Sequence, residues 1–67
     1  MQQPPRTYAD GTQVLWGQNV VTVIGAVRGT RRWYYFIQWP ENGNPRFRYV
    51  REDHLAPYDP PQPPLGE

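Results

Sequence analysis

Residues 33–39 have the sequence Trp-Tyr-Tyr-Phe-Ile-Gln-Trp, and this run of bulky side chains decides which fold the chain can adopt. Aromatic and β-branched residues favour strands, and no apolar period of 3.6 residues accompanies them. Because side chains alternate between the two sides of a strand, a run that is apolar on both sides is expected to be buried on one and to make a contact on the other. The run therefore predicts a central strand.

The chain before this run predicts two further strands. Residues 20–27 are rich in β-branched side chains, and Gly25 inside them is typical of a bulge or a sharp bend. Residues 28–31 (Arg-Gly-Thr-Arg) supply a hairpin turn into the central strand. Residues 12–16 form the first strand, after a turn at Asp10-Gly11.

The chain after the run predicts a return strand and a short helical turn. Pro40 is expected to end the central strand, and residues 41–45 to form a turn before a strand over residues 46–50. Residues 52–55 are typical of one 3-10 turn, and Pro57-Tyr58 is expected to close the sheet on an edge. Four or five short antiparallel strands are too few for a sandwich of two full sheets, so we predict an all-β fold in which they curl into one small barrel.

The size of the chain allows one such domain. At 67 residues with 37% hydrophobic content there is room for a single core, and three Trp, five Tyr and two Phe suit a small one. We expect the barrel over residues 10–58, a flexible tail over 1–9 and a Pro-rich tail over 59–67. The second tail contains a PxxP spacing and favours polyproline II, as a tether or a docking segment.

Composition also limits chemistry and location. The chain has no cysteine, so disulfides and thiolate metal sites are excluded, and we expect no metal and no cofactor. His54 is the single histidine, and Glu52 and Asp53 are neighbours that do not face each other as a catalytic pair must. We therefore predict no enzyme activity. With no signal-like segment and no long apolar run, we expect an intracellular, soluble protein in the cytoplasm, nucleoid or nucleus.

Arginine supplies the main functional signal. The net charge is only +1, but all seven basic residues are Arg, and six of them fall among the aromatic segments. Guanidinium groups bind phosphates in a bidentate way, and aromatic rings stack on bases. The predicted nucleic-acid-binding residues are Arg28, Arg31, Arg32, Arg46, Arg48 and Arg51. The predicted aromatic contact or cage residues are Trp16, Trp33, Trp39 and Tyr49. The alternative is that the aromatics are core and that the Arg stems cover apolar rims.

Three segments carry a resemblance to a known group of domains. They are Gly11-x-x-Val14-Leu15, Tyr35-Phe36-Ile37-Gln38-Trp39 and Tyr49-Val50-x-Glu52-x-x-Leu55. They resemble the chromo-barrel and Tudor group of SH3-like domains over roughly residues 10–58. The short hydrophobic motifs specify a fold better than a ligand.

The resemblance implies a possible ligand, a methylated lysine held in an aromatic cage by cation–π attraction. Trp16, Trp39 and Tyr49 fall on cage positions. However, Asn42 stands where the chromo-barrel pattern has a further Trp, and Arg48 replaces the usual acidic residue. An arginine there would repel a basic histone tail, so this alternative ranks below nucleic acid.

Two other small barrels are similar. The C-terminal domains of retroviral and transposon integrases share the strand order and contact DNA. The plasmid-borne dihydrofolate reductases have the same length, but their Val-Gln-Ile-Tyr active-site stretch would fall on Phe47-Arg48-Tyr49-Val50, which does not match. The sequence thus predicts a non-catalytic module that binds nucleic acid through an Arg and aromatic face. A protein-binding, peptide-binding or oligomerisation module is the alternative, and an oligomeric reductase is a remote one.

Overall fold

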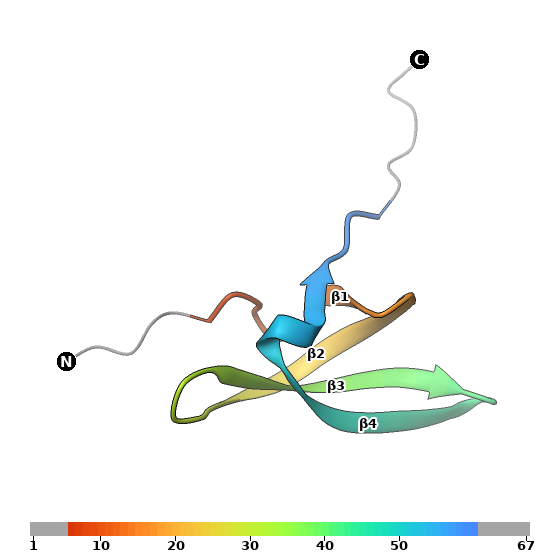
Figure 1. Ribbon diagram of the computed structural model, residues 1–67. Helices are drawn as coiled ribbons and strands as arrows, with labels where there is room; N and C mark the ends of the chain where they lie inside the picture. Colours follow the sequence, from red (N-terminus) through yellow and green to blue (C-terminus); the bar gives the residue numbers. More distant parts are fainter. Residues whose placement is uncertain (1–5, 61–67) are drawn as a thin grey trace, which may run out of the picture.

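The computed structural model describes residues 6–60, and these form one antiparallel sheet (Figure 1). Its five strands are β1 (Gln13–Trp16), β2 (Asn19–Arg28), β3 (Trp33–Glu41), β4 (Asn44–Arg51) and β5 (Leu55–Pro57), with a 3-10 turn, η1 (Glu52–His54), between β4 and β5. The order across the sheet is β4-β3-β2-β1-β5. The prediction of a small all-β fold with one 3-10 turn is confirmed.

The sheet is small-barrel-like but it is not a closed barrel. Figure 1 shows β2, β3 and β4 as a long twisted ribbon, with the short strands β1 and β5 beside it. The strands β4 and β5 are the two edges of the sheet, and no ladder joins them within residues 6–60. One reason is length, because β1 and β5 have only four and three residues. The edge of β4 is consequently free.

The strand β2 pairs with β1 along its first part and with β3 along the rest, and it contains a bulge. Its register with β3 shifts between Val23 and Gly25, as the position of the glycine predicted. Residues 19–22 of β2 pair with β1, and residues 22–28 pair with β3. The bulge bends the strand where it changes partner.

The predicted end of the central strand at Pro40 is wrong. The strand β3 continues to Glu41, and Pro40 lies directly opposite Pro45 of β4. Asn42 and Gly43, both with positive φ (53° and 81°), form a two-residue turn of the kind that closes tight hairpins. In such a hairpin the pair beside the turn is hydrogen-bonded and the next is not, so neither proline has to donate across the ladder. Both prolines therefore fit within the strands.

The core lies on one side of the sheet. Its buried members are Val14, Val21, Val23, Tyr35, Ile37, Val50 and Leu55. Partly buried residues that pack against them are Tyr8, Trp16, Ala26, Trp33 and Trp39. This side of β3 and β4 is called the inner side below, and the opposite side the outer side.

The Tyr35 hydroxyl ties the N-terminal segment to this core. It donates a hydrogen bond to Glu52 Oε2 at 2.8 Å and accepts bonds from the backbone N–H groups of Thr7 and Tyr8 at 3.0 and 3.2 Å. The Tyr8 ring also meets the Tyr35 ring edge-on at 5.4 Å. Residues 6–9, part of the predicted N-terminal tail, thus pack against the sheet. Residues 1–5 of the predicted N-terminal tail and residues 61–67 of the predicted C-terminal tail lie outside the described residues. Most of the PxxP spacing falls in residues 61–67.

Candidate nucleic-acid interface

The β3–β4 ladder divides both the predicted arginines and the predicted aromatics between its two sides. Trp39 faces Arg46 on the inner side, which Arg48 shares, whereas Phe36 faces Tyr49 and Tyr34 faces Arg51 on the outer side. Successive residues of a strand point to opposite sides, so Arg46 and Arg48 point away from Tyr49, while Arg51 lies on the same side as Tyr49. The predicted single face that combines all of them does not form.

Arg48 nevertheless lies against an aromatic ring from another strand. Its guanidinium carbon is 5.3 Å from the ring centroid of Trp16, at the end of β1, and the Trp16 ring lies 5.1 Å from that of Trp39. A cation over an indole is attracted by the ring quadrupole. Among residues 6–60, Arg48 forms no ion pair. Its charge is therefore not neutralised by a carboxylate.

A hollow of about 230 Å³ opens beside Arg48 at the free edge of β4. It is called the β4 hollow here and is lined by Trp16, Tyr34, Arg48, Tyr49, Val50, Arg51 and His54. Four of these seven, namely Trp16, Arg48, Tyr49 and Arg51, are predicted site residues. No carboxylate belongs to the lining, so the hollow combines two arginines with three aromatic rings.

Three lining residues were not among the predicted site residues, namely Tyr34, Val50 and His54. Tyr34 lies directly opposite Arg51, and counting back from a two-residue Asn-Gly turn would have placed it there. His54 lies in η1, and no signal in the sequence connects it with β4.

Two arginines share one carboxylate beside this hollow. Arg51 donates to both Asp53 oxygens at 3.1 and 2.9 Å, and Arg32 donates to Asp53 Oδ2 at 3.2 Å. The hydrogen bonds from Arg51 outweigh partial desolvation, and the charge of Arg32 adds to them, so the pKa of Asp53 lies below its ordinary value. One carboxylate facing two guanidinium groups leaves this end of the sheet positively charged.

The remaining predicted arginines are spread over both ends of the ladder. The Arg28 guanidinium carbon lies 6.0 Å from the ring centroid of Trp33, and Arg31 is exposed in the β2–β3 turn. Arg46 lies at the other end, where its Nε donates to Glu41 Oε1 at 3.1 Å. Arg28 and Arg31 thus lie at the same end of the sheet as Arg51, while Arg46 pairs with Glu41 at the other end.

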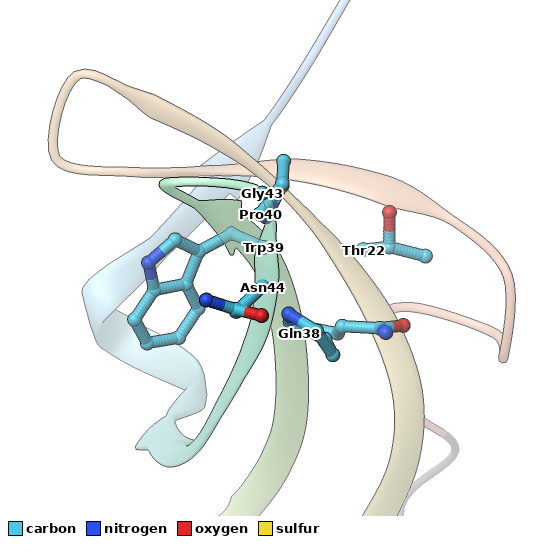
Figure 2. Close-up of a pocket in the computed structure, with 7 residues that line it drawn as sticks. Thr22, Gln38, Trp39, Pro40, Gly43 and Asn44 are labelled. Carbon is cyan, nitrogen blue, oxygen red and sulfur yellow. The ribbon is translucent and has the colours of Figure 1, made fainter.

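A second, larger hollow of about 340 Å³ lies next to the β3–β4 turn. Its lining is Thr22, Gln38, Trp39, Pro40, Gly43, Asn44 and Pro45, and none of these carries a charge. Figure 2 shows the amide side chains of Gln38 and Asn44 between Trp39 and Thr22. This hollow offers amides and one indole but nothing to neutralise a phosphate, so the β4 hollow is the better candidate despite its smaller volume.

The three predicted cage residues do not line one common space, because Trp16 and Tyr49 line the β4 hollow and Trp39 does not. Trp16 and Trp39 are neighbours, but Tyr49 is on the outer side, where its ring lies 4.6 Å from that of Phe36. Arg48 also covers one face of Trp16. No cage formed by these three residues is present to receive a cationic ligand.

The outer side of β3 and β4 carries an aromatic cluster that the core does not use. This outer aromatic cluster consists of Tyr34, Phe36, Phe47 and Tyr49. Phe36 stacks on Phe47 with ring centroids 5.6 Å apart and an interplanar angle of 17°. Tyr34, Phe47 and Tyr49 are 37%, 48% and 58% exposed. These exposed rings are therefore a second candidate contact surface, beside the β4 hollow.

No family model matches the chain, and neither the curated proteins nor the solved structures gave a match. Within residues 6–60, no helix has both the length and the apolar character to cross a membrane. The same part of the chain contains no group of three or more His, Cys, Asp or Glu side chains placed to hold a metal ion.

Proposed function

We propose that the protein is a non-catalytic module that binds nucleic acid at the β4 hollow. The observation that carries this proposal is the lining of the hollow: Arg48 and Arg51 stand beside Tyr34, Tyr49 and Trp16 without a carboxylate among them. Such a set provides charge for phosphates and flat rings for bases or sugars.

The charges near the hollow favour a polyanion. Arg48 has no acidic partner among the described residues, and Arg32 and Arg51 divide a single one. Exposed ion pairs are weak, so a phosphate can displace Asp53 from either arginine at low cost. Arg28 and Arg31 at the same end of the ladder extend the positive surface beyond the hollow.

Salt dependence tests the proposal directly. Labelled single-stranded and duplex oligonucleotides are titrated with the protein at about 50 mM and about 200 mM salt, and fluorescence anisotropy gives the Kd. We expect the logarithm of the affinity to fall with the logarithm of the salt concentration, with a slope of about one for each phosphate neutralised. If the protein binds neither the single-stranded nor the duplex oligonucleotide at the lower salt concentration, the proposal is wrong.

A matched pair of variants locates the site. Arg48→Gln removes the unpaired arginine of the hollow and is expected to weaken binding and to reduce the salt slope by about one. Arg6→Gln removes the same charge from the N-terminal segment, where Arg6 pairs with Asp10, and is expected to change binding little. Equal losses in the two variants would mean that only net charge matters and would remove the β4 hollow as the site.

A second candidate function is protein recognition through the edge of β4. The strand has eight residues, it is an edge of the sheet, and the outer aromatic cluster lies beside it. Alternate residues of an edge strand direct their N–H and C=O groups outward, so a partner strand can add there. Size-exclusion chromatography without nucleic acid separates the two candidate functions. A stable dimer that dissociates in the Phe47→Ala variant would favour protein recognition.

A further inference from the structure

We infer that the preferred partner is a single-stranded nucleic acid whose unpaired bases stack on the outer aromatic cluster while its phosphates follow the edge of β4. This inference rests on the proposed function and names the class of nucleic acid. It depends on the position of Tyr49, which lines the β4 hollow and also contacts Phe36 of the cluster.

The rings of the cluster are available to stack on a ligand. Phe47 and Tyr49 are about half exposed, at 48% and 58%, and both contact Phe36 on the same side of the sheet. The core is complete without them, because the buried residues of β3 and β4 lie on the inner side. A base that stacks on these rings displaces only water.

The spacing of the rings suits an extended strand. Phe47 and Tyr49 are two residues apart on β4, which places them roughly 6.6 Å apart along the strand. Bases within a duplex are spaced about 3.4 Å per strand, about half of that distance, and their faces are covered by neighbouring base pairs. Only an unpaired, extended strand can present successive base faces to both rings.

The arginines border the cluster where a backbone would run. Arg48 and Arg51 line the hollow at the edge of β4, next to Tyr49. A strand with one base on Tyr49 therefore places its neighbouring phosphate within reach of guanidinium groups. Tyr49 thus lies next to both the arginines and the other rings of the cluster. Sequence-tolerant binding of single strands uses this combination of positive charge and stacking surface.

This surface offers fewer contacts to a duplex than to a single strand. Recognition in the major groove needs a helix or a two-stranded ribbon that enters the groove. The helical content of residues 6–60 is the three-residue η1. The β2–β3 turn, with Arg31 and Arg32, is the one described ribbon end with several arginines, so duplex binding through that turn is the competing outcome of the test.

The experiment uses three probes with equal numbers of phosphates: a single-stranded oligonucleotide, a strand of the same length without bases, and a duplex. We expect the protein to bind the single strand most tightly. Tyr49→Ala and Phe47→Ala are each expected to weaken binding to the single strand by about 5- to 150-fold, the loss of one stacked base, and to leave binding to the base-free strand and to the duplex unchanged.

Two further variants keep the test decisive. Tyr49→Phe preserves the ring and is expected to bind like the parent protein. Val20→Ala shortens another exposed apolar residue, in the part of β2 that pairs with β1, and is expected to have no effect on binding. Circular dichroism confirms that each variant is folded, and a variant that unfolds is replaced by the corresponding leucine substitution.

The outcomes separate this inference from the proposed function. If duplex or base-free strand binds as tightly as the single strand, the inference is wrong while nucleic-acid binding stands. If no probe binds, both fail. If Phe47→Ala and Tyr49→Ala dissociate an oligomer but leave single-strand affinity unchanged, the cluster is a protein interface and the inference is wrong.

Discussion

The two sides of the β3–β4 ladder carry similar side chains but differ sharply in exposure. Tyr35 and Ile37 on the inner side are 0% exposed, whereas Phe47 and Tyr49 on the outer side are 48% and 58% exposed. The inner residues belong to the only core cluster of the described residues, and the outer ones contact one another and solvent. Aromatic content alone therefore does not identify the core of this domain, and exposure separates the rings that hold the fold from those that face solvent.

The largest expected difference between the two sides is in stability. Ile37→Ala on the inner side is expected to lower the free energy of unfolding by about 2–5 kcal/mol, because it leaves a cavity in a filled core. Phe47→Ala on the outer side is expected to cost below about 1 kcal/mol, because half of the ring is already in water. Urea unfolding measures both. Similar losses for the two variants would show that the outer cluster is part of the core.

Tyr35→Phe tests the polar contact at the centre of the inner side. Removing the hydroxyl takes one hydrogen bond from Glu52, which keeps its bonds from Thr7, and removes an acceptor from the backbone N–H groups of Thr7 and Tyr8. We expect a loss of about 1–3 kcal/mol. Tyr58→Phe, which changes the same atom in a partly exposed residue, is the control. Urea unfolding of the two variants at neutral pH gives the comparison, and equal stabilities would contradict it.

The same contact predicts a pH dependence. Partial burial raises the pKa of Glu52, but hydrogen bonds from Tyr35 and Thr7 outweigh it. The charge of Arg28 acts in the same direction, so the folded-state pKa lies below the ordinary value. Stability from this group is therefore present above the unfolded pKa and is lost as the pH falls through the folded pKa. Unfolding followed across this acidic range should show a smaller loss in Tyr35→Phe than in the parent protein.

Gly29→Ala should disturb the outer side through close contacts with Tyr34 and Arg32. A Cβ at Gly29 would lie 2.6 Å from Tyr34 Cε1 and 3.0 Å from the Arg32 carbonyl oxygen, so the Tyr34 ring must move. We expect a loss of about 1–3 kcal/mol in thermal unfolding, together with weaker binding at the β4 hollow, which Tyr34 lines. Gly25→Ala is the control, because its Cβ would meet Phe36 Cβ at an ordinary 3.9 Å. A larger effect at Gly25 would contradict the contact.

The smallest effect is expected at the turn that joins the two strands. Asn42 has a φ of 53°, which alanine adopts at a cost of about 1 kcal/mol and glycine adopts freely. Asn42→Ala should therefore lower stability by about that amount, and Asn42→Gly should not. Chemical denaturation resolves the difference, and equal stability of the two variants would show that the turn does not set the register of β3 and β4.

Much of the fold follows from local patterns, and the errors have identifiable causes. The β-branched run at residues 20–27 and the aromatic run at residues 33–39 predicted β2 and β3, and Gly25 predicted the bulge. Pro40 was misjudged because the Asn42-Gly43 turn places it opposite Pro45, where its missing N–H has no consequence for the ladder. The turn chemistry of the following residues outweighed the usual preference of proline to end a strand.

The candidate site was predictable only in part. The sequence identified four lining residues of the β4 hollow by their chemistry, but it placed Arg46 with them, although Arg46 pairs with Glu41 at the opposite end of the ladder. The alternation within β4 already requires Arg46 and Arg48 to point away from Phe47 and Tyr49, and Arg51 to lie on their side. Which side faces the core became evident only from the burial of Val50.

By itself the sequence determined the extended segments, the tight turns between them and the supply of arginine and aromatic side chains, because these depend on backbone preferences over a few residues. The tertiary structure alone decided that β4 is a free edge and that Trp16 of β1 lies beneath Arg48 to form one hollow. The physical reason is that strand order and curvature are set by burying one side of the whole sheet, a sum over distant contacts that no local stretch of residues contains.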